Sequence, residues 1–180
     1  MAETMHHSDY DGPWPWPDFT PGEIACRHCG ELFADDDSLK PTARQPFATQ
    51  EQLRMATAST ASIVASGSEH GENKARGGGS AAEAWLRRSE RSMDCLQRLR
   101  DGWGKPVRLT SAHRCAEHNR RVGGAPHSQH LKLAFDCACP AAEQDAFVSL
   151  ARRCGFTGVG RYPGRNFVHL DCGPERSWRG

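Results

Sequence analysis

The chain has 180 residues, the length of one ordinary domain, and its 23 Lys and Arg residues nearly balance 22 Asp and Glu residues. A net charge of +1 argues against a nucleic-acid partner, which would call for a strongly basic face, and against an acidic disordered tail. No run of about 18 apolar residues occurs, so we expect no membrane insertion. The first residues lack the basic and apolar regions of a secretory signal, so we expect synthesis in the cytoplasm.

Residues 1–17 are predicted to form an extended N-terminal arm. They are rich in Pro, which disfavours a helix, and we expect the rings of Trp14 and Trp16 to dock on the domain. Thr20 is followed three residues later by Glu23, which is the pattern of a capping box. A short helical turn is therefore expected after Thr20.

The composition changes at residues 41–82, where Ala, Ser, Thr and Gly dominate. Such a composition predicts a flexible insertion and accounts for much of the low hydrophobic fraction of 37%. Within it, Thr49 and Gln52 indicate a short helix through Met55.

The rest of the chain alternates between helical and extended patterns. Residues 81–101 repeat Trp85, Ser89, Met93 and Leu96 at helical spacing. Further strands and one helix are predicted, in chain order, at 107–111, 134–138, 140–154 (helix), 157–162 and 166–171. This order predicts a small α+β domain at residues 18–180 that carries the insertion.

Two histidines have informative neighbours. His169 and Asp171 alternate along a predicted strand and so share one face, while His130 precedes Asp136 by six residues. A His/Asp/His set leaves the fourth position of zinc open, as in catalytic sites. Asp171 would then accept a proton from zinc-bound water. From spacing alone, a hydrogen-bonded polar pair without metal is the alternative.

The wider motifs extend this hypothesis. Residues 106–130 read PVRLTSAHRCAEHNRRVGGAPHSQH, and the closing part contains GFTGVGRYP at 155–163 and NFVHLDC at 166–172. These motifs resemble peptidase family M15, which contains zinc D-Ala-D-Ala carboxypeptidases and related peptidoglycan peptidases, bacteriophage-type members included. The resemblance covers roughly residues 18–33 and 83–180. It implies a small antiparallel sheet with packed helices, similar to the scaffold of DD-peptidases and of the Hedgehog signalling domain.

The resemblance also implies roles for individual residues. It makes His130, Asp136 and His169 the ligands of one zinc ion. Arg114 would hold a substrate carboxylate or the developing oxyanion, because a guanidinium donates two parallel hydrogen bonds. Ser128 would orient the substrate or support His130. The implied reaction is metal-assisted hydrolysis, in which zinc activates water and polarises the peptide carbonyl.

The chain departs from the family pattern in three places, one of which is the arginine motif, Ser-Ala-His-Arg at 111–114 where Ser-Gly-Tyr-Arg is common. The family has seven residues from the first His to the Asp and a Gly between them, whereas the step from His130 to Asp136 is six and has no Gly. A one-residue change inside a strand would turn Asp136 to the other face, but a turn at 131–133 could absorb it. Asn166 stands where many members have an acidic base, so the base role passes to Asp171.

Eight cysteines require an explanation. Cys26-x-x-Cys29 is either a structural staple, by disulfide or zinc, or a redox pair, and we favour the staple because no thioredoxin-like pattern surrounds it. A structural zinc at Cys26 and Cys29 lacks an evident second half in the sequence, although Cys115 is a candidate to meet one of them. The cysteines expected in the core are Cys95, Cys137, Cys154 and Cys172.

We therefore expect a zinc peptidase that hydrolyses peptidoglycan stem peptides or cross-links. The phage-type motifs suggest a lysin that acts on the cell wall after release or as part of a virion. The alternative is a catalytically silent, zinc-bound binding or structural module on the same fold, favoured by the short His130–Asp136 step and by Asn166. The bond cleaved and the oligomeric state do not follow from the sequence.

Overall fold

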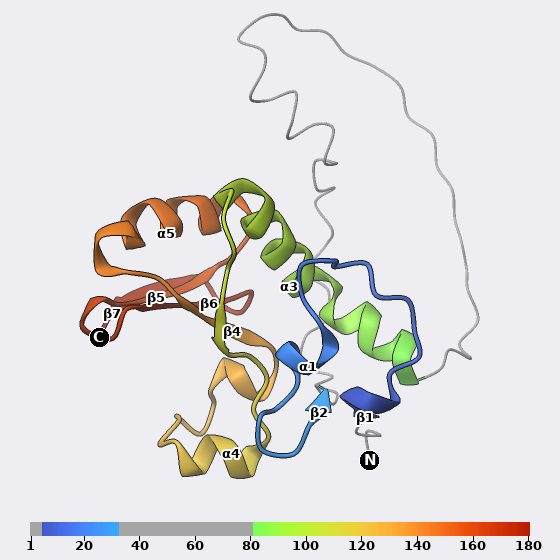
Figure 1. Cartoon of the computed structure of the whole chain (residues 1–180). Helices are drawn as coiled ribbons and strands as arrows, with labels where there is room; N and C mark the ends of the chain where they lie inside the picture. Colours follow the sequence, from blue (N-terminus) through green and yellow to red (C-terminus); the bar gives the residue numbers. More distant parts are fainter. Residues whose placement is uncertain (1–4, 33–80) are drawn as a thin grey trace, which may run out of the picture. The chain divides into compact units, whose positions relative to one another are not determined.

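Five strands form the main sheet, in the spatial order β3-β4-β6-β5-β7 (Figure 1). Their bounds are β3 Leu109–Ser111, β4 Ala134–Ala138, β5 Gly158–Tyr162, β6 Phe167–Asp171 and β7 Arg176–Arg179. Neighbours pair antiparallel except β5 and β7, which run parallel. The computed structural model describes residues 5–32 and 81–180, so nearly all of the insertion predicted at 41–82, with its short helix, lies outside the described residues.

The N-terminal residues form a small layer of their own. Strand β1 (Met5–His6) pairs with β2 (Glu31–Leu32), and a 3-10 turn, η1, spans His7–Asp9. Helix α1 (Pro21–Ile24) begins with the predicted capping box. The box satisfies backbone donors at the start of this single turn, which holds Ile24 in the core.

Helix α3 (Ala81–Trp103) supplies the largest apolar surface under the sheet. Its buried stripe contains the residues that the helical spacing singled out, namely Trp85, Ser89, Met93, Leu96 and Leu99. The helix runs two residues beyond the predicted end and stops at Gly104, whose φ of 70° closes it in the left-handed region. Trp14 stacks on Trp85 with ring centroids 5.4 Å apart, so the aromatic N-terminal segment covers this helix.

Helix α5 (Gln144–Arg153) packs beside α3. A 3-10 turn, η3 (Ala141–Glu143), precedes it, so the helix begins later than the predicted start at Pro140. Phe147 meets Trp103 of α3 edge-on at 4.9 Å between ring centroids. Figure 1 shows α5 covering one side of the sheet and α4 (Ala116–Arg121) lying on the other.

The two faces of the sheet differ in chemistry. One face is apolar and fully buried in the core shared with α3 and α5, through Phe135, Cys137, Val159, Val168 and Leu170. Because side chains alternate along a strand, Asp136, His169 and Asp171 fall on the opposite face. The remaining 3-10 turns are η2 (Gln129–Leu131) and η4 (Pro163–Arg165). The fold is the predicted α+β class, and it presents its polar residues on the face away from the two long helices.

Among the helices of the described ranges, none has both the length and the apolar character that a bilayer crossing requires.

Candidate metal centre

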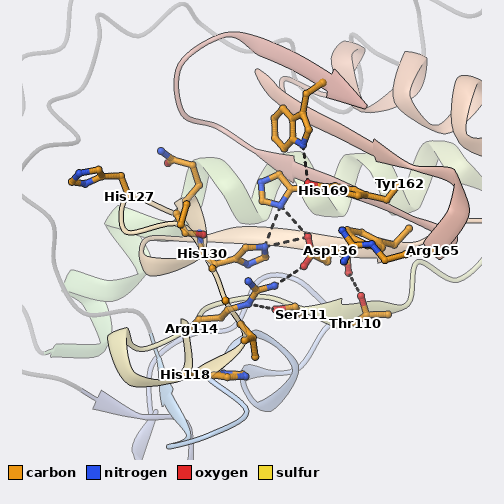
Figure 2. Close-up of a pocket in the computed structure, with 18 of the residues that line it drawn as sticks. Thr110, Ser111, Arg114, His118, His127, His130, Asp136, Tyr162, Arg165 and His169 are labelled. Atoms are coloured by element: carbon orange, nitrogen blue, oxygen red, sulfur yellow. Dashed lines mark hydrogen bonds and ion pairs between the residues drawn. The ribbon is translucent and has the colours of Figure 1, made fainter. Parts of the chain in front are cut away.

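Three side chains from different elements converge on one point of the polar face (Figure 2). His130 comes from η2, Asp136 from β4 and His169 from β6. His130 Nε2 lies 3.1 Å from His169 Nδ1 and 3.1 Å from Asp136 Oδ1, and the last two atoms are 2.9 Å apart. Asp136 and His169 are direct cross-strand partners, so the sheet register itself brings them together.

These three atoms fit a single metal ion. Nitrogen and carboxylate oxygen lie at about 2.0–2.2 Å from zinc, so tetrahedral ligands stand about 3.3 Å from one another. The observed separations of 2.9 to 3.1 Å come close to that geometry. Two imidazoles and one carboxylate are a donor set that zinc accepts, and they leave a fourth position open. The structure thus brings together all three ligands that the family resemblance implies.

His130 is held by backbone and side-chain contacts that aim Nε2 at the other ligands. Its Nδ1 donates to the carbonyl oxygen of Ala112 at 2.6 Å, which fixes the tautomer. Ser128 caps η2, and its Oγ accepts from the His130 backbone N at 3.3 Å. Burial lowers the pKa of His130 and so favours the neutral ring that a metal requires. Ser128 therefore supports His130, one of the two roles expected of it.

Asp136 faces the site despite the shortened step from His130. The turn at Leu131–Leu133 takes up the difference, since Lys132, the residue that follows η2, has an uncommon backbone conformation of φ −98° and ψ −105°. Burial disfavours the charged carboxylate, but the neighbouring His130 and His169 rings outweigh burial and hold the pKa of Asp136 well below its usual range. The carboxylate is therefore ionised and ready to bind a cation.

Arg114 contacts the second oxygen of the same carboxylate. Its Nη2 donates to Asp136 Oδ2 at 2.7 Å, and its Nε donates to Ser111 Oγ at 2.8 Å. A guanidinium beside the carboxylate fixes the carboxylate's orientation and leaves Oδ1 toward the histidines. Arg114 also lines the cleft, so it lies where the expected contact with substrate would be made.

A cleft of about 800 Å³ opens over the three residues. Its charged lining is mostly cationic, with Arg27, Arg114, Arg165 and Arg176, and among the described lining residues Asp136 is the one carboxylate. Aromatic rings form one wall: Tyr162 stacks on Phe167 at 4.3 Å, and Trp178 Nε1 donates to Tyr162 Oη at 2.8 Å. No functional role was predicted for Tyr162, Phe167 or Trp178 from the sequence.

A family model described as Peptidase M15 matches residues 67–171, which is more than half of the chain. The chain belongs to peptidase family M15. It is 38% identical over 95 residues to the peptidoglycan L,D-endopeptidase MepK of Escherichia coli (strain K12), covering 47% of this chain and 51% of that protein. It is 39% identical over 59 residues to the probable peptidoglycan L,D-endopeptidase MepK of Haemophilus influenzae, covering 32% of each.

The chain spans about half the length of the Escherichia coli relative that it matches. The same 38% identity over 95 residues is found with the MepK protein of Shigella flexneri. The segment from the start of α3 to the end of β6 lies inside the residues that the family model matches.

Asp171 of this M15 chain lies behind His169, away from the other ligands. Its Oδ2 is 3.0 Å from His169 Nε2, whereas His169 Nδ1 faces Asp136. Arg176 donates to both of its oxygens, at 2.6 and 3.1 Å, and the Gly173 backbone N donates to Oδ1 at 2.8 Å. Burial opposes ionisation, but His169, Arg176 and Gly173 lower the pKa of Asp171. Both oxygens of Asp171 are thus engaged with cationic or N–H partners.

Strand alternation predicts only part of this arrangement. Alternation correctly puts His169 and Asp171 on one face, but it does not say which ring nitrogen meets which neighbour. Asn166 is also removed from the reaction: it occupies a left-handed position with φ 52°, and its Oδ1 accepts from the Ala141 backbone N at 3.2 Å. The position where many family members carry an acidic base thus serves a turn in this chain.

Two glycines of β5 make room for this arrangement. Gly158 pairs with Asp171 and Gly160 pairs with His169 across the sheet. A Cβ atom on Gly158 would overlap the Asp171 carboxylate, and one on Gly160 would overlap the indole of Trp178. The G-V-G segment is therefore required by close packing against the residues that support the site.

Proposed function

We propose that this chain is a zinc metallopeptidase that hydrolyses a peptide bond in peptidoglycan stem peptides or their cross-links. The observation that carries the proposal is the convergence of His130 Nε2, Asp136 Oδ1 and His169 Nδ1 beneath the cleft. Membership of peptidase family M15 supports the reaction class. The substrate class is supported by the similarity to peptidoglycan L,D-endopeptidases.

The cleft favours an endopeptidase over a terminal D-Ala-D-Ala carboxypeptidase. The candidate ligands lie between His127 on one side and Tyr162 and Arg165 on the other (Figure 2). Lining residues on both sides of the site can contact a peptide on both sides of the cleaved bond, which suits cleavage within a chain or cross-link. The cationic lining also suits stem peptides, which carry several free carboxylates.

Each residue has a distinct part in the proposed reaction. A zinc ion, when bound, would lower the pKa of a water molecule and polarise the scissile carbonyl. His130, Asp136 and His169 would hold it through Nε2, Oδ1 and Nδ1, the three atoms that converge beneath the cleft. Arg114 orients Asp136 and presents its guanidinium to a substrate carboxylate or to the oxygen that gains charge.

Asp171 has a positioning role in this proposal. Its carboxylate fixes the ring of His169 through Nε2 and is itself fixed by Arg176. Carboxylates in this position raise the basicity of a ligating imidazole and set its orientation. Asp171 therefore acts through His169 and does not itself contact the reacting atoms.

The test measures zinc content and muropeptide cleavage on the same samples of wild type, His130→Ala, Asp136→Ala and His169→Ala. We expect the wild type to cleave and each variant to lose both the zinc of this site and cleavage. His127→Ala, which changes an exposed histidine of the same cleft, should keep its zinc. A wild type that binds no zinc would overturn the proposal, and zinc binding without cleavage would favour the catalytically silent module.

Two finer expectations belong to this proposal without further support. One is that the protein is a phage-type lysin, and the other is that it acts on the wall after release or as part of a virion. Both rest on the resemblance of its motifs to phage-type family members.

A further inference from the structure

A second group of metal-binding side chains lies outside the proposed reaction. The Sγ atoms of Cys26, Cys29 and Cys115 all lie within 4.8 Å of one another. Cys26 is buried and the other two are half-buried. Cys26 and Cys29 follow helix α1, whereas Cys115 precedes helix α4, so the fold joins two segments that are distant in sequence. The Cys-x-x-Cys spacing of Cys26 and Cys29 suggested a metal site, and Cys115 was a candidate to contact one of them, but the sequence showed no complete second pair of ligands.

His118 lies beside this group and is the candidate for a fourth ligand, through its contact with Cys26. Its Nδ1 lies 3.5 Å from Cys26 Sγ. Cys115 is the N-cap of α4, and its Sγ accepts from the His118 backbone N at 3.4 Å. Residues three apart at a helix start share one face, so Cys115 and His118 present their side chains together. The second half of the site is therefore a Cys-x-x-His pair.

The distance between Cys26 Sγ and His118 Nδ1 suits two ligands of one tetrahedral zinc ion. With sulfur at about 2.3 Å and nitrogen at about 2.0–2.1 Å from the metal, neighbouring S and N ligands stand about 3.5 Å apart and two sulfurs about 3.8 Å apart. The Cys26–His118 distance of 3.5 Å equals the first value. Three cysteines and one histidine also form a closed ligand set, which is typical of structural zinc sites.

The backbone around Cys26 supports a thiolate at this position. The backbone N of Cys115 donates to Cys26 Sγ at 3.3 Å, and the backbone N–H groups of His28 and Cys29 also point at this sulfur. Gly30 ends the turn with φ 72° and donates its N–H to the Cys26 carbonyl at 2.8 Å. N–H donors favour the charged form of a thiol, and that form is the one that binds zinc.

We propose that Cys26, Cys29, Cys115 and His118 bind a structural zinc ion that is separate from the ion of the candidate active site. The Cys26-x-x-Cys29 turn and the start of α4 are its two halves. A disulfide would use only two of the three sulfurs and would leave His118 without a role. The zinc site uses all four side chains.

The site would fasten the N-terminal layer to the segment that carries Arg114. Arg114 directly precedes Cys115, and its backbone N donates to the His130 carbonyl at 2.8 Å. The neighbouring His113 backbone N donates to the Ile24 carbonyl at 3.1 Å. The structural ion would therefore help to fix residues 113–115, which lie between the proposed structural zinc site and the candidate active site.

Metal content of the full chain, prepared in the presence of a reductant, tests the proposal. We expect about two zinc ions per chain in the wild type, and about one in both His130→Ala and Cys29→Ser. Co²⁺ provides the identifying signal, because thiolate ligands add an intense near-ultraviolet charge-transfer band. Co²⁺-loaded His130→Ala should show this band, and the double variant with Cys29→Ser should lose it. A His130→Ala protein that binds no metal, or binds Co²⁺ without the band, would overturn the proposal.

Two further measurements keep the test independent of whether Cys29→Ser folds. In the zinc-loaded wild type, alkylation followed by peptide mapping should spare Cys26, Cys29 and Cys115 until a chelator is added. His28→Ala is the matched control for His118→Ala, since His28 Nδ1 lies 3.7 Å from Cys115 Sγ but is exposed within the turn. His118→Ala should weaken the second zinc at least tenfold and His28→Ala should not. The reverse result, or a disulfide at Cys26, would show that the assignment is wrong.

Discussion

His169 is held at both ring nitrogens, by Asp136 at Nδ1 and by Asp171 at Nε2. The two contacts differ in function, since Nδ1 faces the candidate metal position and Nε2 faces a carboxylate that is fully buried and paired with Arg176. A ligand fixed in this way loses little freedom when it binds a metal. Asp136 and His169 would therefore bind the metal directly, whereas Asp171 would orient one of its ligands.

Asp171→Asn distinguishes the positioning role from a base role. We expect zinc affinity to fall about 10- to 100-fold, because the ring of His169 loses its charged partner. Cleavage should recover when zinc is supplied in excess, which competition with a chromophoric chelator and parallel activity assays would measure. Asp145→Asn is the matched control, because Asp145 forms an exposed ion pair with Arg161 at 3.4 Å. Unchanged zinc affinity with no cleavage at saturating zinc would instead identify Asp171 as the base.

The same carboxylate predicts a pH dependence of stability in the metal-free protein. His169, Arg176 and Gly173 lower the pKa of Asp171 below the ordinary 3.8, so the unfolded chain binds a proton before the folded chain does. The stability that Asp171 contributes is therefore present above about pH 4 and is lost as the pH falls through the lowered pKa. Urea unfolding should show wild type about 1–3 kcal/mol more stable than Asp171→Asn at pH 7 and a smaller difference near pH 3. A difference that does not change with pH would contradict this assignment.

At the scale of elements, β5 is shaped by its neighbours as much as by its own sequence. Its valine, Val159, points into the core, while Gly158 and Gly160 face Asp171 and Trp178. β-branched or aromatic residues at these two positions would have a higher β-strand propensity, but their side chains would displace Asp171 and Trp178. Strand β5 therefore has a low intrinsic β-strand propensity at two positions, because glycine is needed there for the close approach of neighbouring side chains.

Gly158→Ala tests this relation between strand and site. The added methyl group overlaps the Asp171 carboxylate, so we expect stability to fall by about 1–3 kcal/mol and zinc affinity to fall with it. Gly164→Ala is the control, since a Cβ there meets nothing within 4 Å. Thermal unfolding and zinc titration of both variants provide the measurements. Equal behaviour of the two variants would mean that the packing around Asp171 is looser than described.

Most elements could be predicted because each carries its own periodic pattern. The apolar stripe of α3 and the alternation of β4 and β6 are strong local signals. Strand β7 was not predicted, because its four residues, Arg176–Arg179, contain one apolar side chain and pair in parallel with β5. Its contribution to the cleft, through Arg176 and Trp178, depends on tertiary contacts that no local pattern contains.

The site was predictable only in part for a related reason. Motif resemblance located His130, Asp136 and His169, since these residues stand in ordered and mutually spaced segments. Whether Asp136 faces the site after a six-residue step depends on how the turn before β4 is built, and that turn is a tertiary feature. The orientation of Asp171 depends likewise on Arg176 and Gly173, which lie beyond the motif that suggested its role.

Across the described residues as a whole, the two faces of the sheet have different roles: one packs in the apolar core, and the other carries the residues of the cleft. Helices α3 and α5 cover the apolar face, and the aromatic N-terminal segment extends that core through Trp14 and Trp16. The polar face is left to η2, α4 and the ends of the strands, which line the cleft. One proposed zinc ion would join η2, β4 and β6 at this face, and the other would join the turn after α1 to the start of α4.

The central claim, that this cleft hydrolyses peptidoglycan peptides, is tested most directly by digesting purified cross-linked muropeptides with the zinc-loaded full chain. Mass spectrometry should show fragments whose masses sum to that of the substrate plus one water, and a cut within the cross-link distinguishes an endopeptidase from release of terminal D-Ala. We expect cleavage to stop on chelation, to return with zinc and to be absent in His169→Ala. Muropeptides that remain intact with a wild type carrying zinc at His130, Asp136 and His169 would contradict the account.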